Sequence, residues 1–113
     1  TWVVDGRLTH QDSLGNRGDL VPGTVQRMSA GRGIRHSEAN GSAADTLHLL
    51  QIWILPKVSG AEPRYEDRVI DPGLLRNRLH PIASGYGDPD ALSLYQDAAV
   101  YAGRLDAGVT AET

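Results

Sequence analysis

The sequence predicts an all-β fold of antiparallel strands. Short runs rich in β-branched and aliphatic residues recur along the 113 residues, and 13 Gly and 6 Pro lie scattered between them as turn signals. The sequence shows no apolar period that is typical of a long helix. About eight short strands without a long helix indicate a sandwich or a barrel.

The first third of the chain is expected to form strands at residues 2–5, 8–12 and 25–29. The first run is apolar and β-branched, and the second is polar and alternating. With the two-glycine loop at 13–18, these two runs predict a pair of antiparallel strands and a turn. Pro22 and Gly23 predict a second turn before the third strand.

Residues 46–55 form the strongest strand pattern. Both faces of this run are mostly apolar, which predicts a strand that is buried on both sides. A helix would also fit the length, but the β-branched residues, Trp53 and the terminating Pro56 favour a strand. His48 is then expected to be a core histidine with one hydrogen bond. Gln51 and Trp53 share one face and would line a substrate cavity or pack in the core.

The remainder of the chain predicts a loop at 56–67, a turn at 71–73 and one helical turn at 74–78. Strands are expected at 79–83, 91–96 and 99–104, with the Gly-rich turn 85–90 after the first of them. The tail 106–113 has few apolar residues and is expected to fray.

Composition excludes several classes of protein. The net charge is −3, and the 11 basic residues are spread without a cluster, which argues against direct nucleic-acid binding. No apolar run approaches the roughly 20 residues that span a bilayer, and no leader pattern is visible. Cysteine is absent, which excludes disulfides and thiolate metal sites and is compatible with a cytoplasmic location. Because the chain starts at Thr1 and its only Met is Met28, we expect upstream residues to be missing.

His36 and Glu38 are the candidate site residues. On a strand, residues two apart project from the same face, so an imidazole and a carboxylate would lie side by side. These groups suit iron, manganese, nickel, cobalt or zinc, but a stable site needs further ligands. The alternative is that the two side chains bond each other or water on an exposed face. Arg32 and Arg35 would steer an anionic substrate or form a solvated pair.

The other three histidines are weaker candidates. His10 lies on the polar run and is expected to be exposed, and His80 precedes Pro81 and is expected at the surface. His48 has the core position described above. None of the three is predicted to be a ligand.

Several segments resemble the pirin family of the cupin superfamily. Gly33-Ile34-Arg35-His36-Ser37-Glu38-Ala39-Asn40 is similar to the end of the second cupin motif, Gly-x-x-His-x-x-x-Asn. Further segments that are similar to pirins are residues 8–16, 21–38, 49–54 and 62–66. The resemblance implies an incomplete double-stranded β-helix barrel. It also implies a division into residues 1–67, a partial N-terminal cupin with half of the metal site, and residues 68–113, an inter-cupin segment and the start of a second cupin packed on the first.

The resemblance also implies chemistry. Pirins hold one divalent metal, usually Fe(II), with three His and one Glu, and several oxidise flavonols such as quercetin with dioxygen. His36 and Glu38 match two of these ligands, and Glu38 would also act as the catalytic base. The other two ligands come from a His-x-His pair that would precede Thr1. The chain alone is therefore expected to bind metal weakly or not at all, with Mn, Ni, Co, Cu or Zn as alternatives to iron.

Two alternatives to the dioxygenase remain at this stage. Some pirin relatives act as metal-responsive co-regulators of transcription, which bind proteins without turnover, and a chain without the full site would be inactive. A barrel that lacks strands exposes sheet edges, which predicts a homo-oligomer or strand exchange with another copy.

Overall fold

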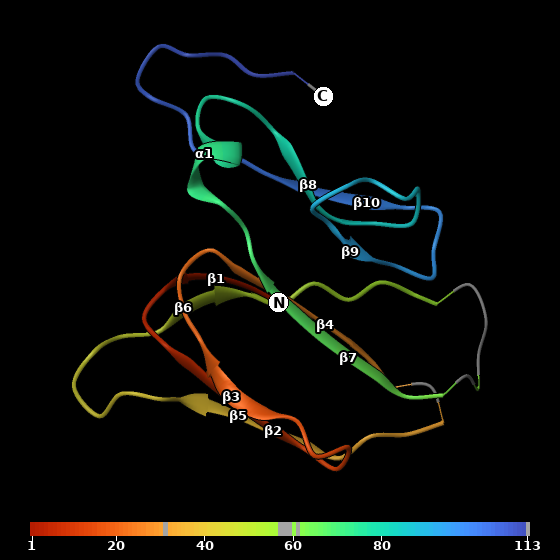
Figure 1. Cartoon of the computed structure of the whole chain (residues 1–113). Coiled ribbons are helices and arrows are strands. Elements are labelled where there is room, and N and C mark those ends of the chain that lie inside the picture. The colour runs from red at the N-terminus through yellow and green to blue at the C-terminus, as the bar shows by residue number, and fades with distance from the viewer. Residues whose placement is uncertain (31, 57–59, 61, 113) are drawn as a thin grey trace.

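The computed structural model describes residues 1–30, 32–56, 60 and 62–112. It confirms the all-β prediction and contains ten strands and one short helix in these residues (Figure 1). In chain order the elements are β1 (Trp2–Asp5), β2 (Leu8–Asp12), β3 (Arg17–Leu20), β4 (Thr24–Ser29), β5 (His36–Asn40), β6 (His48–Leu50), β7 (Arg64–Val69), α1 (Pro72–Leu75), β8 (His80–Ser84), β9 (Leu92–Ser93) and β10 (Ala99–Ala102).

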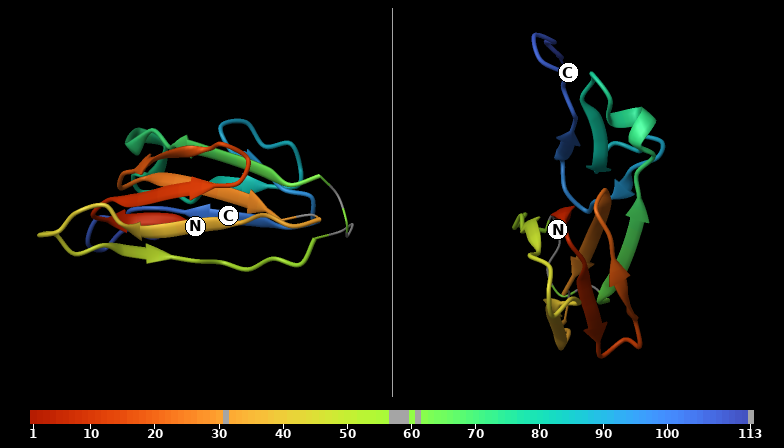
Figure 2. Two further views of the ribbon diagram at one scale, coloured as in Figure 1. Left: turned by 90° about the horizontal axis from the view of Figure 1, so that it is seen from below. Right: turned by 90° about the vertical axis from the view of Figure 1, so that its left-hand side faces the viewer.

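The strands form three sheets, which lie one above another from the bottom to the upper part of Figure 1. A four-stranded sheet has the order β6-β1-β4-β7, and two three-stranded sheets have the orders β3-β2-β5 and β10-β8-β9. The paired strands run antiparallel except for β8 and β9, which are parallel. The molecule is flat, with extents of 45 × 39 × 18 Å (Figure 2).

Two predictions about the strands and one about the helical turn differ from the structure. β1 and β2 do not pair, because the chain turns at Gly6 (φ 83°) and sends them into different sheets. β3 begins inside the expected loop 13–18 and β7 lies largely inside the expected loop 56–67, because both are mostly polar and exposed edge strands without an apolar alternation. The helical turn also begins earlier than expected, at Pro72, where Asp71 accepts a hydrogen bond from the Gly73 amide at 2.9 Å.

The predicted buried strand at 46–55 is also wrong. Only His48–Leu50 is a strand, and it lies at the edge of its sheet next to β1. Trp53 is 90% exposed and Leu55 is 84% exposed, and both His48 and Gln51 are exposed. An edge strand has a neighbour on one side alone, so an apolar sequence does not by itself place it in the core.

Two clusters of buried apolar side chains hold the sheets together. The smaller one joins β1 to the β3-β2-β5 sheet through Val3, Leu8 and Leu20. The larger one joins β4 to α1 and the β10-β8-β9 sheet and consists of Val25, Ile70, Leu75, Ile82, Ala83 and Leu92. In the described residues, no helix is long and apolar enough to cross a membrane.

Candidate metal centre

The two predicted site residues lie on β5, as their spacing indicated. β5 pairs antiparallel with β2, so that His36 is opposite Asp12 and Glu38 is opposite His10. Residues two apart on a strand share a face, so His36 and Glu38 project from the same side of β5. Their role as ligands remains a prediction.

His36 and Glu38 differ in their surroundings. His36 is exposed, whereas the Glu38 side chain is only 15% exposed. The Oε1 atom of Glu38 is buried and has no hydrogen-bond partner among the residues that the structure describes. A buried carboxylate oxygen without a donor is unfavourable, so this atom calls for a cation or a proton.

The glycine-flanked approach to β5 is open rather than crowded. A side chain at Gly33 (φ 133°) would meet no described atom within 4 Å, and Gly31 lies outside the described residues. Arg32 forms an exposed ion pair with Glu62, and Arg35 is exposed. The two arginines therefore lie in solvent, as the interpretation of a solvated pair predicts.

His10 was expected to be exposed, and this is wrong: its side chain is 0% exposed. The ring belongs to the central strand of the β3-β2-β5 sheet and stacks on Tyr65 of β7, with 4.3 Å between the ring centroids. It also stacks on His36 at 6.1 Å. Its Nδ1 atom lies 3.5 Å from Oε1 of Glu38, which places it beside the candidate site.

Hydrogen bonds hold the His10 ring on both sides. Nε2 lies 2.7 Å from Oδ2 of Asp12, and Nδ1 lies 3.2 Å from Nε2 of Gln26. The same Gln26 amide nitrogen donates to the Tyr65 hydroxyl at 3.4 Å, and this hydroxyl donates to Asp67 at 2.8 Å. A chain of hydrogen-bonded polar groups thus runs beside Glu38, from the exposed Asp67 of β7 through the buried Gln26 and His10 to Asp12 of β2.

The carboxyl group of Asp12 is held in its charged form. Burial raises the pKa of Asp12, but hydrogen bonds from His10, Asn16 and the Leu14 amide outweigh this effect and lower it to about 2. The pKa of the Tyr65 hydroxyl is raised by burial and by the neighbouring Asp67, against a smaller opposite effect of Gln26. The network of hydrogen bonds around His10 therefore has an ionised acceptor at Asp12 and a protonated donor at Tyr65.

The depressed pKa of Asp12 predicts an acid-dependent stability. Since the pKa is lower in the folded chain than its ordinary value of 3.8, the stabilisation is complete above about pH 5 and is lost as the pH falls toward 2. We expect Asp12→Asn to lower the free energy of unfolding at pH 7. The difference in this free energy between the variant and the unsubstituted chain should shrink as the pH falls to 2. Urea unfolding between pH 2 and pH 7 measures both values.

The exposed Asp5 at the end of β1 provides the matched control for this experiment. Asp5→Asn is expected to change stability little at any pH. A stability deficit of Asp12→Asn that stays constant from pH 7 to pH 2 would contradict the linkage to Asp12 ionisation.

His36 and Glu38 offer two donor atoms that are suited to a metal ion. The imidazole of His36 and the donor-free Oε1 of Glu38 are suitable ligands for a divalent transition metal. In the part of the chain that the structure describes, no group of three or more His, Cys, Asp or Glu side chains is arranged to hold a metal ion. The pair by itself offers two donors, fewer than the three or four that a stable transition-metal site needs.

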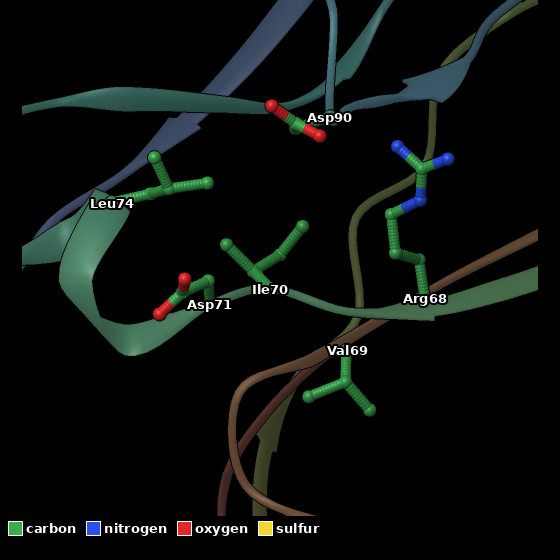
Figure 3. Close-up of a pocket in the computed structure, with 6 residues that line it drawn as sticks. All are labelled: Arg68, Val69, Ile70, Asp71, Leu74 and Asp90. Carbon is green, nitrogen blue, oxygen red and sulfur yellow. The ribbon is translucent and has the colours of Figure 1, made fainter.

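The remaining predicted residues lie away from this pair. His48 is exposed on β6, and His80 is half-buried on β8 with its Nε2 atom buried, so neither the core position nor the surface position was right. A separate hollow lies where β7 approaches α1 (Figure 3), and none of the predicted site residues lines it. Its lining residues are Arg68, Val69, Ile70, Asp71, Leu74 and Asp90.

Comparison with known proteins relates this chain to one family. Residues 1–54 match the family model named Pirin. A pirin-like protein of Caulobacter vibrioides is 45% identical over 111 residues, which cover 97% of this chain and 47% of the relative. A quercetin 2,3-dioxygenase of Escherichia coli is 54% identical over 71 residues, which cover 63% of this chain and 31% of the relative.

Solved structures agree with the sequence matches. The crystal structure of YhhW from Escherichia coli has a TM-score of 0.81 at 42% identity and covers 88% of this chain and 42% of its own. A structure of the same bacterial pirin in complex with nickel(II) gives a TM-score of 0.79 at 41% identity, with 88% and 42% covered. The chain spans about half of the length of the curated relatives that match most of it.

Proposed function

Because this chain belongs to the pirin family, we propose that it supplies part of a metal-dependent dioxygenase that acts on flavonols such as quercetin. The observation that carries the proposal is the buried Oε1 atom of Glu38, which has no hydrogen-bond donor in the described residues. A carboxylate oxygen left in this state beside an imidazole on the same strand face is suited to a cation. The name of the E. coli relative supports the choice of substrate class.

Each site residue has a distinct role in this proposal. A divalent metal, with Fe(II) preferred, would supply the redox chemistry when bound. His36 would hold it through a ring nitrogen and Glu38 through Oε1, with further ligands from outside this pair. Glu38 would also take the proton from the flavonol hydroxyl, because a carboxylate at this position reaches the substrate without a large movement.

A chimera tests the proposal. Residues 1–113 would replace the matching segment of the E. coli quercetin 2,3-dioxygenase, to which this chain is 54% identical over 71 residues. Loaded with Fe(II), the chimera is expected to consume oxygen in the presence of quercetin. His36→Ala and Glu38→Gln should each reduce the rate by more than about 100-fold, beyond the loss typical of an outer partner of a metal ligand.

His48→Ala serves as the matched control for the chimera, because His48 is an exposed histidine on β6. It should leave oxygen consumption unchanged. A chimera that retains metal but consumes no oxygen would contradict the dioxygenase and favour the metal-responsive co-regulator instead.

We also propose that the chain pairs with a second copy through its exposed apolar edge, which consists of Leu50, Ile52, Trp53 and Leu55. This edge continues directly from β6, the outer strand of the four-stranded sheet. An outer strand offers unpaired backbone groups, and the adjacent apolar side chains add area that association removes from water. Pairing or exchange of this strand between two copies would cover both.

Self-association follows as a prediction. Light scattering at rising protein concentration is expected to show a dimer, and Trp53→Lys combined with Leu55→Lys should restore the monomer. Tyr86→Lys is the control, because Tyr86 is 64% exposed outside the apolar edge. A monomer at every concentration would overturn the proposal.

A further inference from the structure

The chain of hydrogen-bonded polar groups beside Glu38 has a fixed direction of hydrogen bonding. It contains two carboxylates at its ends and three groups between them, in the order Asp67, Tyr65, Gln26, His10 and Asp12. A carboxylate accepts and cannot donate, so each end determines where the protons of the chain lie.

The Asp67 end settles the state of the Nδ1 atom of His10. The Tyr65 hydroxyl donates its one hydrogen bond to Oδ2 of Asp67, at a distance of 2.8 Å. Its oxygen can therefore only accept a hydrogen bond from Gln26. The Gln26 atom at this position is therefore the amide nitrogen, and this nitrogen also lies 3.2 Å from Nδ1 of His10. Since an amide nitrogen donates, Nδ1 must accept and carries no proton.

The Asp12 end leads independently to the same result. Oδ2 of Asp12 accepts from Nε2 of His10 at 2.7 Å, while Oδ1 accepts from the backbone amides of Leu14 and Asn16 at 2.9 and 3.0 Å. The proton of the His10 ring is therefore on Nε2. The ring is fully buried and stacked on Tyr65, so packing also fixes its orientation.

This tautomer explains why Glu38 has no donor. The unprotonated Nδ1 atom of His10 lies 3.5 Å from Oε1 of Glu38, so two acceptors face each other. No hydrogen bond forms between two acceptors, and the buried oxygen keeps its lone pairs free. A protonated Nδ1 would have satisfied it.

We propose that His10 is a positioning residue for cation binding. Asp12 and Gln26 hold it as the neutral Nε2–H tautomer, and in this form it withholds a proton from Glu38 and keeps Oε1 available to a divalent metal. His10 acts through Glu38 and does not itself bind the metal. The inference rests on the proposed function insofar as Glu38 is a ligand, and it adds the group that prepares this ligand.

The first test needs no substitution. Nitrogen-15 NMR of the histidine rings of the 113-residue chain distinguishes a protonated from an unprotonated ring nitrogen. For His10 we expect a proton on Nε2 and none on Nδ1. A proton on Nδ1 at neutral pH would overturn the inference.

The second test reverses the tautomer. Asp12→Asn is nearly isosteric: its oxygen can still accept from the Leu14 and Asn16 backbone amides, while its NH₂ group faces Nε2 of His10 and donates to it. The variant loses the hydrogen bond that Oδ2 accepts from Nδ2 of Asn16 at 3.0 Å. Because no acceptor then faces Nε2, the ring proton is expected on Nδ1, where it bonds Glu38 and displaces the Gln26 amide nitrogen from its contact with the ring. Titration of the chimera with Mn(II) chloride, followed by the paramagnetic broadening of β5 signals, should show that Asp12→Asn reduces its affinity by about 10–100-fold.

Asp19→Asn removes the same charge from the neighbouring strand β3 without touching His10, so it should reduce Mn(II) affinity far less. Equal losses of Mn(II) affinity in the two variants would mean that the removed negative charge alone causes the effect, which would overturn the inference. An Mn(II) affinity of the chimera that Asp12→Asn leaves unchanged would also overturn it. The proposed function fails by a separate observation, namely oxygen consumption by the chimera that survives His36→Ala and Glu38→Gln.

Discussion

Replacing Ile82 with alanine is expected to lower the free energy of unfolding by about 2–5 kcal/mol. Ile82 is 2% exposed on β8 and belongs to the larger core cluster, which also contains Val25 of β4 and Leu92 of β9. Truncation removes buried apolar area and leaves a cavity that the surrounding strands fill only in part. Equilibrium unfolding in urea, followed by circular dichroism, measures the loss.

Val69→Ala is the control for this substitution, because Val69 is 63% exposed on β7 and should change stability by no more than about 0.5 kcal/mol.

The same experiment tests the proposed division into residues 1–67 and 68–113 packed on each other. Since Trp2 packs against the larger cluster from β1, its fluorescence and the circular dichroism should report one transition. Two separate transitions would contradict packing of the two parts as one cooperative unit.

The sequence was informative where a short-range pattern determines the geometry. The spacing of His36 and Glu38 is enough to place them on one face of β5, because the period of a strand is two residues. The β-branched run of β1 and the apolar run of β8 likewise identify their strands. These features need no knowledge of the neighbouring strands.

The polar strands and the burial of His10 depend on neighbours that are distant in sequence. β7 is charged, and its pairing with β4 is the contact that makes it a strand. His10 is buried because Tyr65, which is 55 positions later, covers its ring. One local signal for His10 does exist: it shares the alternating face of β2 with Leu8, which is 2% exposed. A histidine two residues from a core leucine on a strand is therefore a better candidate for burial than the polarity of its run suggests.

Replacing Gly6 with alanine is expected to destabilise the chain by about 2–5 kcal/mol. Gly6 has a φ of 83°, in the left-handed region that is costly for a residue with a Cβ atom. The added Cβ would also collide with the backbone of the segment before β6, since it would lie 2.8 Å from Cα of Leu47 and in contact with the carbonyl oxygen of Thr46. Thermal or urea unfolding of the variant measures the combined effect.

Gly15→Ala separates the two causes, because Gly15 has a φ of 90° but no described atom within 4 Å of the added Cβ. It should lose only about 1–2 kcal/mol from the backbone conformation. If Gly6→Ala loses no more than Gly15→Ala, then the contact with Thr46 and Leu47 is not restrictive. The larger loss matters for the site, because Gly6 is the turn from β1 to β2. The strand that positions His10 beside Glu38 therefore leaves the four-stranded sheet at a residue that must be glycine.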